Sequence, residues 1–258
     1  MRSMQWVVPA MAVVLMSFLM GCGKDNSTAP ASGPTPTVVT ATGNITTRVN
    51  DFRTALGPPN GGTPGEQQTG RREINWDGAA ANPFDNRNDF PADFFNTTVK
   101  AGSVYATPGT GLRNDSTLFA EVNPTYATQF NFFSPNKIFA AVGSNQMDFV
   151  FEVAGQPTAA VVNGFGVVFS DVDMAGRTTI QLFAKNGSSL GVFAAPVRSD
   201  AAGFSFLGVT FADPVIARAR ITLGTAALGA GVNDVSSGGT ADLVVLDNVI
   251  YGEPHASH

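Results

Sequence analysis

The side chains that can do chemistry in this sequence are almost all oxygen donors. Its 258 residues include 1 Cys and 2 His, which lie near the ends of the chain at Cys22, His255 and His258. No imidazole or thiol is therefore placed inside a folded core for a Ser–His–Asp triad, a zinc site or a proton shuttle. The acidic residues are 15 Asp and 5 Glu. Chemistry in the folded part must depend on them.

Two aspartates have a spacing that suits a hard cation. Asp171 and Asp173 end the apolar run that begins at Gly164. In an extended chain, residues two apart lie on the same face with Cα atoms about 6–7 Å apart. Ca²⁺ binds several carboxylate and carbonyl oxygens, and we expect a third oxygen from Asp247 or Asn248, which interrupt an apolar final strand. Alternatively, Asp173 begins a turn and Asp247 bonds a neighbouring backbone amide or an arginine.

The same residue types allow a second interpretation, a carboxylate-dependent glycan hydrolase. Such enzymes need two carboxyl groups about 5–10 Å apart across a cleft. Glu73, Asp77, Asp171 or Asp173 can supply the pair. Nothing in the sequence marks one of them as an acid with a raised pKa, so the main expectation is a protein that is not an enzyme.

Aromatic and arginine side chains are the candidates for contact with a ligand. Carbohydrate-binding surfaces usually stack sugar rings on Trp or Tyr, which makes Trp76 and Tyr251 candidates. The chain has 20 Phe but only 2 Trp and 3 Tyr, which weakens this interpretation. Arg218 and Arg220 lie on the polar face of an alternating run and can bind an acidic glycan, although solvated strand arginines are the common alternative.

Composition favours strands and turns for the elements that position these residues. The chain has 28 Gly and 16 Pro, and its acidic residues are mostly Asp, which favours turns over helices. From residue 97 to residue 252, short runs with a period of two alternate with Gly- and Asn-rich breaks. This pattern predicts an all-β fold, a β-sandwich or jelly roll. The candidate strands are Thr97–Thr107, Thr117–Val122, Thr128–Phe133, Met147–Ala154, Ala160–Phe169, Thr178–Ala184, Ser189–Ala194, Gly203–Phe211, Val215–Leu223 and Ala241–Tyr251.

The N-terminus carries the pattern of a lipoprotein signal peptide. Arg2 precedes the apolar stretch Val7–Met20, which is too short for a comfortable membrane span. Leu19-Met20-Gly21-Cys22 resembles the bacterial lipobox, which implies cleavage after residue 21 and a lipid on Cys22. An ordinary signal peptide with an incidental cysteine is the alternative. Because Gly23 rather than Asp follows the cysteine, the resemblance also favours sorting to an outer membrane.

One folded domain is expected between a tether and a tail. Residues 22–43 are rich in Ser, Thr, Pro and Gly and predict a flexible tether. Residues 44–252 form the β-sandwich domain. A short helix is expected at Asn44–Leu56. It should be followed by an ordered but irregular segment, held in place by its aromatic side chains, up to residue 96, and then by the strands of 97–252. Residues 253–258 are expected to be a disordered tail.

Four segments resemble a group of uncharacterised secreted bacterial proteins, some of which carry PEP-CTERM sorting tails. The segments are Asp51–Gly57, Gly70–Gly78, Gly164–Asp173 and Asp247–Gly252, and Arg-Arg-Glu-Ile-Asn-Trp-Asp-Gly is the most specific string. The resemblance covers most of residues 45–252. It implies an extracellular β-sandwich of carbohydrate-binding-module-like shape, and no activity. This sequence lacks the sorting tail, and a lipid on Cys22 would replace that attachment.

These features together predict a binding or structural module of the cell envelope. The formal net charge of -5 and the charged fraction of 14% argue against nucleic acid as a partner. The expected partners are the membrane, through Cys22, and a glycan or an envelope protein. Calcium is the expected cofactor, and an outer membrane or cell surface is the expected location.

Overall fold

The computed structural model describes residues 33–79 and 84–257. The chain divides into two units, Met1–Ser32 and Gly33–His258, and the described residues all belong to the second. The predicted signal peptide and Cys22 lie outside the described residues. Within the described ranges, no helix is long and apolar enough to cross a membrane.

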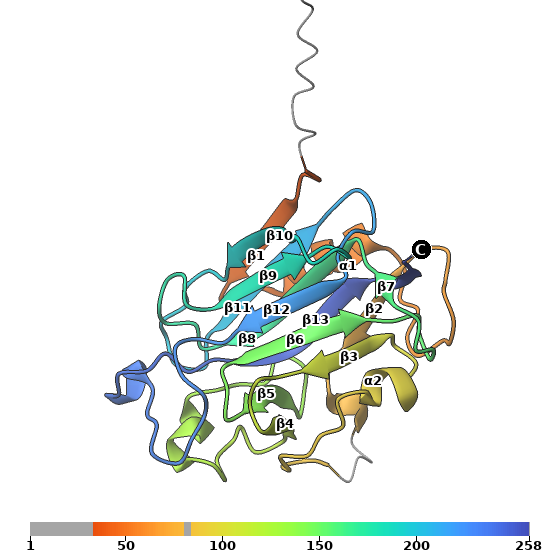
Figure 1. The fold of residues 1–258 in the computed structure, drawn as a ribbon. Coiled ribbons are helices and arrows are strands. Elements are labelled where there is room, and N and C mark those ends of the chain that lie inside the picture. The colour runs from red at the N-terminus through yellow and green to blue at the C-terminus, as the bar shows by residue number, and fades with distance from the viewer. Residues whose placement is uncertain (1–32, 80–83, 258) are drawn as a thin grey trace, which may run out of the picture. The chain divides into compact units, whose positions relative to one another are not determined.

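Two antiparallel sheets lie face to face in the second unit (Figure 1). One sheet has the order β1 (Thr37–Thr42), β11 (Phe204–Thr210), β8 (Gly164–Ser170), β13 (Val245–Gly252), β5 (Ile138–Val142) and β4 (Gly111–Asp115), and β2 (Arg71–Ile74) also pairs with β13. The other has the order β10 (Ser189–Ala194), β9 (Thr179–Phe183), β12 (Arg218–Thr222), β6 (Gln146–Phe151) and β3 (Ser103–Ala106). A small ladder joins β14 (His255–Ala256) to β7 (Ala160–Val161). We call the first sheet A and the second sheet B, and their arrangement confirms the predicted all-β sandwich.

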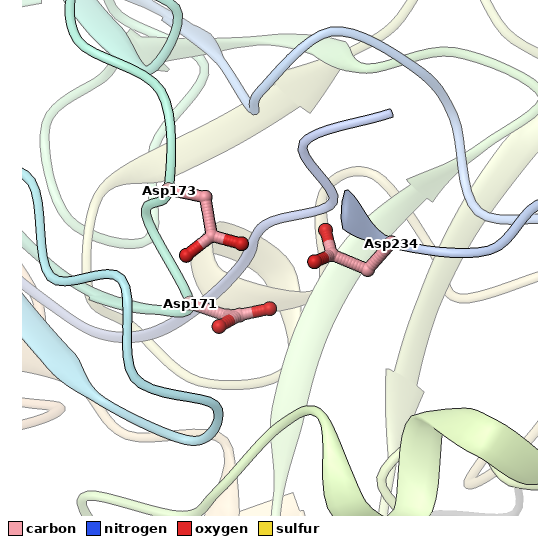
Figure 2. Close-up of side chains that lie close together, drawn as sticks. All are labelled: Asp171, Asp173 and Asp234. Carbon is pink, nitrogen blue, oxygen red and sulfur yellow. The ribbon is translucent and has the colours of Figure 1, made fainter. Parts of the chain in front are cut away.

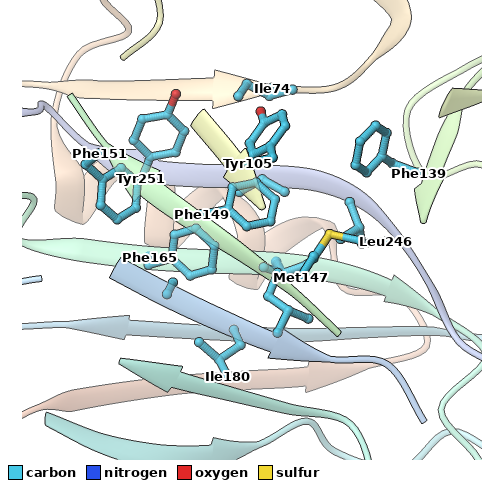
Figure 3. Close-up of a cluster of buried hydrophobic side chains, with 14 of the residues drawn as sticks. Ile74, Tyr105, Phe139, Met147, Phe149, Phe151, Phe165, Ile180, Leu246 and Tyr251 are labelled. Atoms are coloured by element: carbon cyan, nitrogen blue, oxygen red, sulfur yellow. The ribbon is translucent and has the colours of Figure 1, made fainter. Parts of the chain in front are cut away.

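Strand alternation builds the core between the sheets. Ala219 and Ile221 on β12 are fully buried, whereas Arg218 and Arg220 between them are partly exposed. This is the pattern that the alternating sequence predicts for a strand with one wet face. Figure 3 shows the inward-facing aromatic and aliphatic side chains of both sheets packed together. By contrast, β8 and β13 are buried along their whole length because sheet A is covered on both faces.

A single helix covers part of the outer face of sheet A. The helix α1 (Thr46–Leu56) packs Val49, Phe52 and Leu56 against β8, β11 and β13, which confirms the predicted N-terminal helix. Two glycines allow this close approach, since a Cβ added at Gly166 or Gly208 would lie within 2.7 Å of the Phe52 ring. Glycine on these two strands therefore lets the helix rest directly on the sheet.

The rest of that outer face is covered by two irregular segments. Residues 116–134 include the 3₁₀ turn η2 (Pro124–Thr128), and residues 224–244 include the 3₁₀ turn η3 (Val235–Ser237). Their side chains pack with β5 and β13 in a separate cluster, which we call the satellite cluster: Phe119, Tyr126, Phe130, Ile138, Ala140, Leu243 and Val245. The strands expected at Thr117–Val122 and Thr128–Phe133 do not form. Their aromatic residues instead cover a sheet, as a loop can do equally well.

The remaining short elements lie around the aromatic core near residue 76. The helix α2 (Phe94–Thr97) contacts β3, and the 3₁₀ turn η1 (Asp77–Ala79) follows the Trp76 indole. That indole stacks on Phe139 with ring centroids 3.9 Å apart. The described part of 44–96 is thus ordered by its aromatic side chains, as expected.

Both expected boundaries of the domain are wrong. Residues 37–42, placed in the tether, form β1, whose six residues all pair with β11. The β-branched residues of this Thr-Val-Val-Thr run suit an edge strand, and they outweigh the polar composition around them. At the other end, β14 pairs with β7, and Glu253 is buried with its carboxylate accepting a 2.6 Å hydrogen bond from Arg72 Nε. Residues 253–257 therefore belong to the folded domain, and residue 258 lies outside the described residues.

Candidate cation site

Three carboxylates converge where sheet A ends (Figure 2). Asp171 directly follows β8, its backbone has a φ of 71°, and its N–H donates to the Gly203 carbonyl at 2.9 Å. Asp173 lies two residues further along the same turn. Asp234 comes from the connection between β12 and β13. One carboxylate oxygen of each residue lies within 4.8 Å of the other two.

Three of the four carboxylate oxygens of Asp171 and Asp173 have no hydrogen-bond partner among the described residues. Asp171 is fully buried, and its Oδ1 has no hydrogen-bond partner among the described residues. Both carboxylate oxygens of Asp173 are buried and equally unpartnered within that part of the chain. Buried unpaired charge is costly unless a cation or a proton neutralises it. The unpartnered oxygen of the fully buried Asp171 side chain, within this group of three carboxylates, distinguishes the site from an ordinary acidic surface.

Burial and like charge both raise the pKa values here. Burial raises the pKa of Asp171 to about 8, and the charges of Asp234, Asp173 and Asp242 act in the same direction, while a hydrogen bond from Gln129 opposes them. Burial also raises the pKa of Asp173 to about 7, followed by its contacts with Asp234 and the charge of Asp242. The charged groups that act on these two carboxyls are themselves carboxylates. The site therefore favours positive charge.

A frame of hydrogen bonds holds the third carboxylate in place. Asp234 caps η3, with Oδ1 accepting from Ser236 N at 2.8 Å and Oδ2 accepting from Leu243 N at 2.7 Å. Asp242 accepts from the N–H groups of Asp173 and its successor Met174, each at 3.1 Å. Backbone N–H groups therefore hold the carboxylates of Asp234 and Asp242 in place beside Asp171 and Asp173.

Gln129 connects this frame to the segment 116–134. Its Oε1 accepts hydrogen bonds from the hydroxyls of Ser236 and Ser237, each at 2.9 Å, and its Nε2 donates to Asp171 Oδ2. Sequence reasoning missed Gln129, Asp234 and Asp242. An Asp two residues before a Ser is a helix-cap pattern, but no signal in the sequence links residue 234 to residue 171.

Asp247 and Asn248 do not join this site, so the expected third ligand is wrong. The pairing of β13 with β8 shifts register between Leu246 and Val249, which places both polar residues in a bulge. There, Asp247 Oδ2 accepts from Phe133 N at 2.7 Å, as the alternative interpretation predicts. Asn248 Nδ2 donates to Glu73 Oε1 at 2.7 Å.

Of the four residues expected to contact a ligand, two are buried and two are partly exposed. Trp76 and Tyr251 are core residues with less than 2% exposure, and the Trp76 indole N–H donates to the Asp247 carbonyl. They cannot form a sugar-stacking surface. Arg218 and Arg220 lie on the outer face of sheet B with side chains 28% and 42% exposed, and both pair with Asp148.

The carboxylates considered for glycan hydrolysis have different neighbours. Glu73 accepts a 3.0 Å hydrogen bond from Arg53 Nε of α1. Asp77 lies close enough to Asp247 for its charge to raise the pKa of that carboxyl. Asp171 and Asp173 lie together in the candidate cation site.

Comparisons with known proteins find only a distant likeness. No protein-family model and no curated protein matches the chain. A solved structure, the enzymatically active domain of tailspike protein 4 of bacteriophage CBA120, is similar at 14% sequence identity and a TM-score of 0.29. The match covers 64% of this chain and 21% of the tailspike chain. Such a likeness identifies no function here, and the resemblance to secreted bacterial proteins stays a prediction.

Proposed function

We propose that the protein is a lipid-anchored module of the cell envelope whose β-sandwich is stabilised by calcium at Asp171, Asp173 and Asp234. The observation that supports the ion is the convergence of three carboxylates, two of which have buried oxygens without partners in the described residues. Oxygen-only donors suit a hard cation.

The donor set favours Ca²⁺ over Mg²⁺. Ca²⁺–O bonds are about 2.3–2.6 Å long, so two oxygens on opposite sides of the ion lie about 4.6–5.2 Å apart. The three oxygens lie within 4.8 Å of one another, so one Ca²⁺ can contact all of them. Mg²⁺ demands near-ideal octahedral geometry and gives up its water reluctantly, which makes it a poorer fit to a site built from protein carboxylates. Water or backbone carbonyls would complete the usual shell of about 6–8 oxygens.

Thermal unfolding of the purified full-length chain tests the ion. Calcium should raise the unfolding midpoint relative to chelator, because a ligand that binds only the folded state stabilises it. Magnesium should raise the midpoint less. The variant Asp213→Asn, which changes an exposed aspartate outside the site, should respond to calcium like the native chain. A midpoint that calcium leaves unchanged would contradict the ion. A fragment covering only 44–252 is unsuitable, since it lacks β1 and Glu253.

The anchor and the partner rest on sequence and surface features. The lipobox-like ending at Cys22 supports attachment to a membrane. The outer face of sheet B, with Arg218 and Arg220 partly exposed, supports contact with an acidic glycan or an envelope protein. A glycan array probed with the calcium-loaded chain tests the first class, and Arg220→Gln should reduce any signal that depends on this face.

A further inference from the structure

We propose that the cation acts as a clasp that docks residues 233–243 onto the end of sheet A. This inference rests on the proposed calcium site. Two of the three carboxylates, Asp171 and Asp173, belong to the turn after β8. The third, Asp234, belongs to the long connection between β12 and β13. An ion bound to all three therefore joins two segments that lie about 60 residues apart in the chain.

The connection has little structure of its own to hold it in place. Residues 224–244 contain five glycines and, besides the 3₁₀ turn η3, no helix or strand. Such a segment is ordered by its contacts rather than by local propensity. The contacts divide into two groups along the segment, and they differ in whether they depend on the cation site.

The first half is held by contacts that do not involve the carboxylates. Tyr126 Oη lies 3.0 and 2.8 Å from the carbonyl oxygens of Gly229 and Val232, which share its single hydrogen, and it accepts from Gly229 N at 3.2 Å. Asn123 Nδ2 donates to the Val232 carbonyl at 3.1 Å. Tyr126 is itself fully buried in the satellite cluster. These bonds fix residues 229–232 whether or not an ion is bound.

The second half is held around the carboxylates. Asp234 Oδ2 accepts from Leu243 N, and the Gly239 N–H donates to the Asp234 carbonyl at 2.7 Å, so residues 234–243 close on themselves around Asp234. This closed loop then faces Asp171 and Asp173 with a carboxylate of the same sign. Neutral groups also bridge the two sides: Gln129 does so through Ser236 and Ser237, and the N–H groups of Asp173 and Met174 donate to the Asp242 carboxylate.

Whether the carboxylates of the loop and of the turn repel each other or are held together therefore depends on a bound ion. Without a cation, the ionised carboxylates of the loop and of the turn repel each other, which favours local opening of residues 233–243. With calcium, both sides bind the same positive charge. Opening would uncover Leu243, which is fully buried in the satellite cluster. Extracellular calcium modules bind in the range of about 10⁻⁴–10⁻³ M, so the clasp would close after export.

Hydrogen exchange measured by mass spectrometry tests the clasp on the purified full-length chain, in parallel with a direct calcium-binding measurement. At a free calcium concentration about 100 times the dissociation constant, exchange of the amides of residues 233–243 should slow by up to about 100-fold. Strand β9, which belongs to sheet B and contributes no carboxylate to the site, serves as the internal reference and should change much less. Asp173→Asn should remove the protection, and Asp213→Asn should keep it.

The outcomes separate the clasp from the calcium site itself. Calcium binding with selective protection of 233–243 supports the clasp. Binding with no protection there, or with equal protection of β9, would overturn the clasp and leave the calcium site intact. Absence of binding would overturn both. Tyr126→Phe provides a further check. Amide exchange at residues 229–232 should become faster in this variant, while calcium should still slow exchange at residues 233–243. If calcium no longer slowed exchange at 233–243, the contacts of the two halves of the segment would not be independent.

Discussion

Replacing Asp173 by Asn separates the charge of the cation site from its structure. Both carboxylate oxygens of Asp173 are buried and accept no hydrogen bond from the described residues. Asp173→Asn therefore removes a negative charge and breaks no side-chain hydrogen bond in that part of the chain. We expect it to stabilise the protein in chelator and to destabilise it in calcium, relative to the native chain.

The magnitudes follow from the spacing of the oxygens. Those of Asp171, Asp173 and Asp234 lie within 4.8 Å of one another. Two full charges at such a distance repel by about 3.5 kcal/mol at an effective dielectric constant of about 20. Because residue 173 is partly exposed, water screens part of this repulsion, and we expect a net gain of about 2–4 kcal/mol in chelator. Calcium at about 100 times its dissociation constant stabilises the native chain by about 2.7 kcal/mol, and the variant loses most of this.

Urea denaturation of both chains, with chelator and with saturating calcium, measures the effect. The experiment belongs at about pH 8.5, above the pKa of about 7 for Asp173 and of about 8 for Asp171, so that the carboxyls are ionised. Asp213→Asn is the matched control and should change neither free energy of unfolding by more than about 0.5 kcal/mol. If Asp173→Asn lowered stability equally in both conditions, the reasoning from charge would be refuted.

Three further changes test other parts of the structure. Burial raises the pKa of Asp247 from 3.8 to about 7. Between these two values the folded state binds more protons than the unfolded state. The free energy of unfolding therefore falls, by up to about 1.4 kcal/mol for each pH unit, as the pH rises. Asp247→Asn should make that decline shallower between about pH 5 and 7 in urea titrations, and an unchanged slope would argue against this titration. Glu253→Gln leaves the buried Arg72 guanidinium without its counter-charge and should cost about 3–5 kcal/mol, whereas the exposed Glu66→Gln should cost under about 1 kcal/mol. Cys22→Ser should move the protein from the membrane fraction to the soluble fraction on cell fractionation, and continued membrane association would contradict the lipid anchor.

The sandwich could be predicted from strand periodicity because alternation has a direct physical cause. In Ala217–Leu223, the small or apolar residues face the core and the polar ones face outward, as the structure shows for β12. Strands β4 and β5 were not predicted. In β4, Arg113, Asn114 and Asp115 are buried polar residues, so this strand lacks an apolar alternation. Its burial depends on segments from elsewhere in the chain that cover the sheet.

The cation site was predicted in part for a similar reason. Asp171 and Asp173 were found because their spacing is local and a strand fixes the geometry of neighbouring residues. Asp234 was missed because its position depends on how a glycine-rich connection folds back, and local sequence does not encode that. Asp247 was chosen because a polar residue in an apolar strand needs a partner, and it has one. Its partners are the N–H groups of Phe133 and Ser134 and the Ser134 hydroxyl, from a loop more than 100 residues away.

Calorimetric titration of the metal-free, full-length chain with calcium measures binding at the proposed site. We expect saturable binding of one Ca²⁺ per chain, weaker binding of Mg²⁺, and strong loss of calcium affinity in Asp173→Asn but not in Asp213→Asn. No saturable calcium binding at millimolar concentrations, or equal affinity in both variants, would contradict a calcium site at Asp171, Asp173 and Asp234.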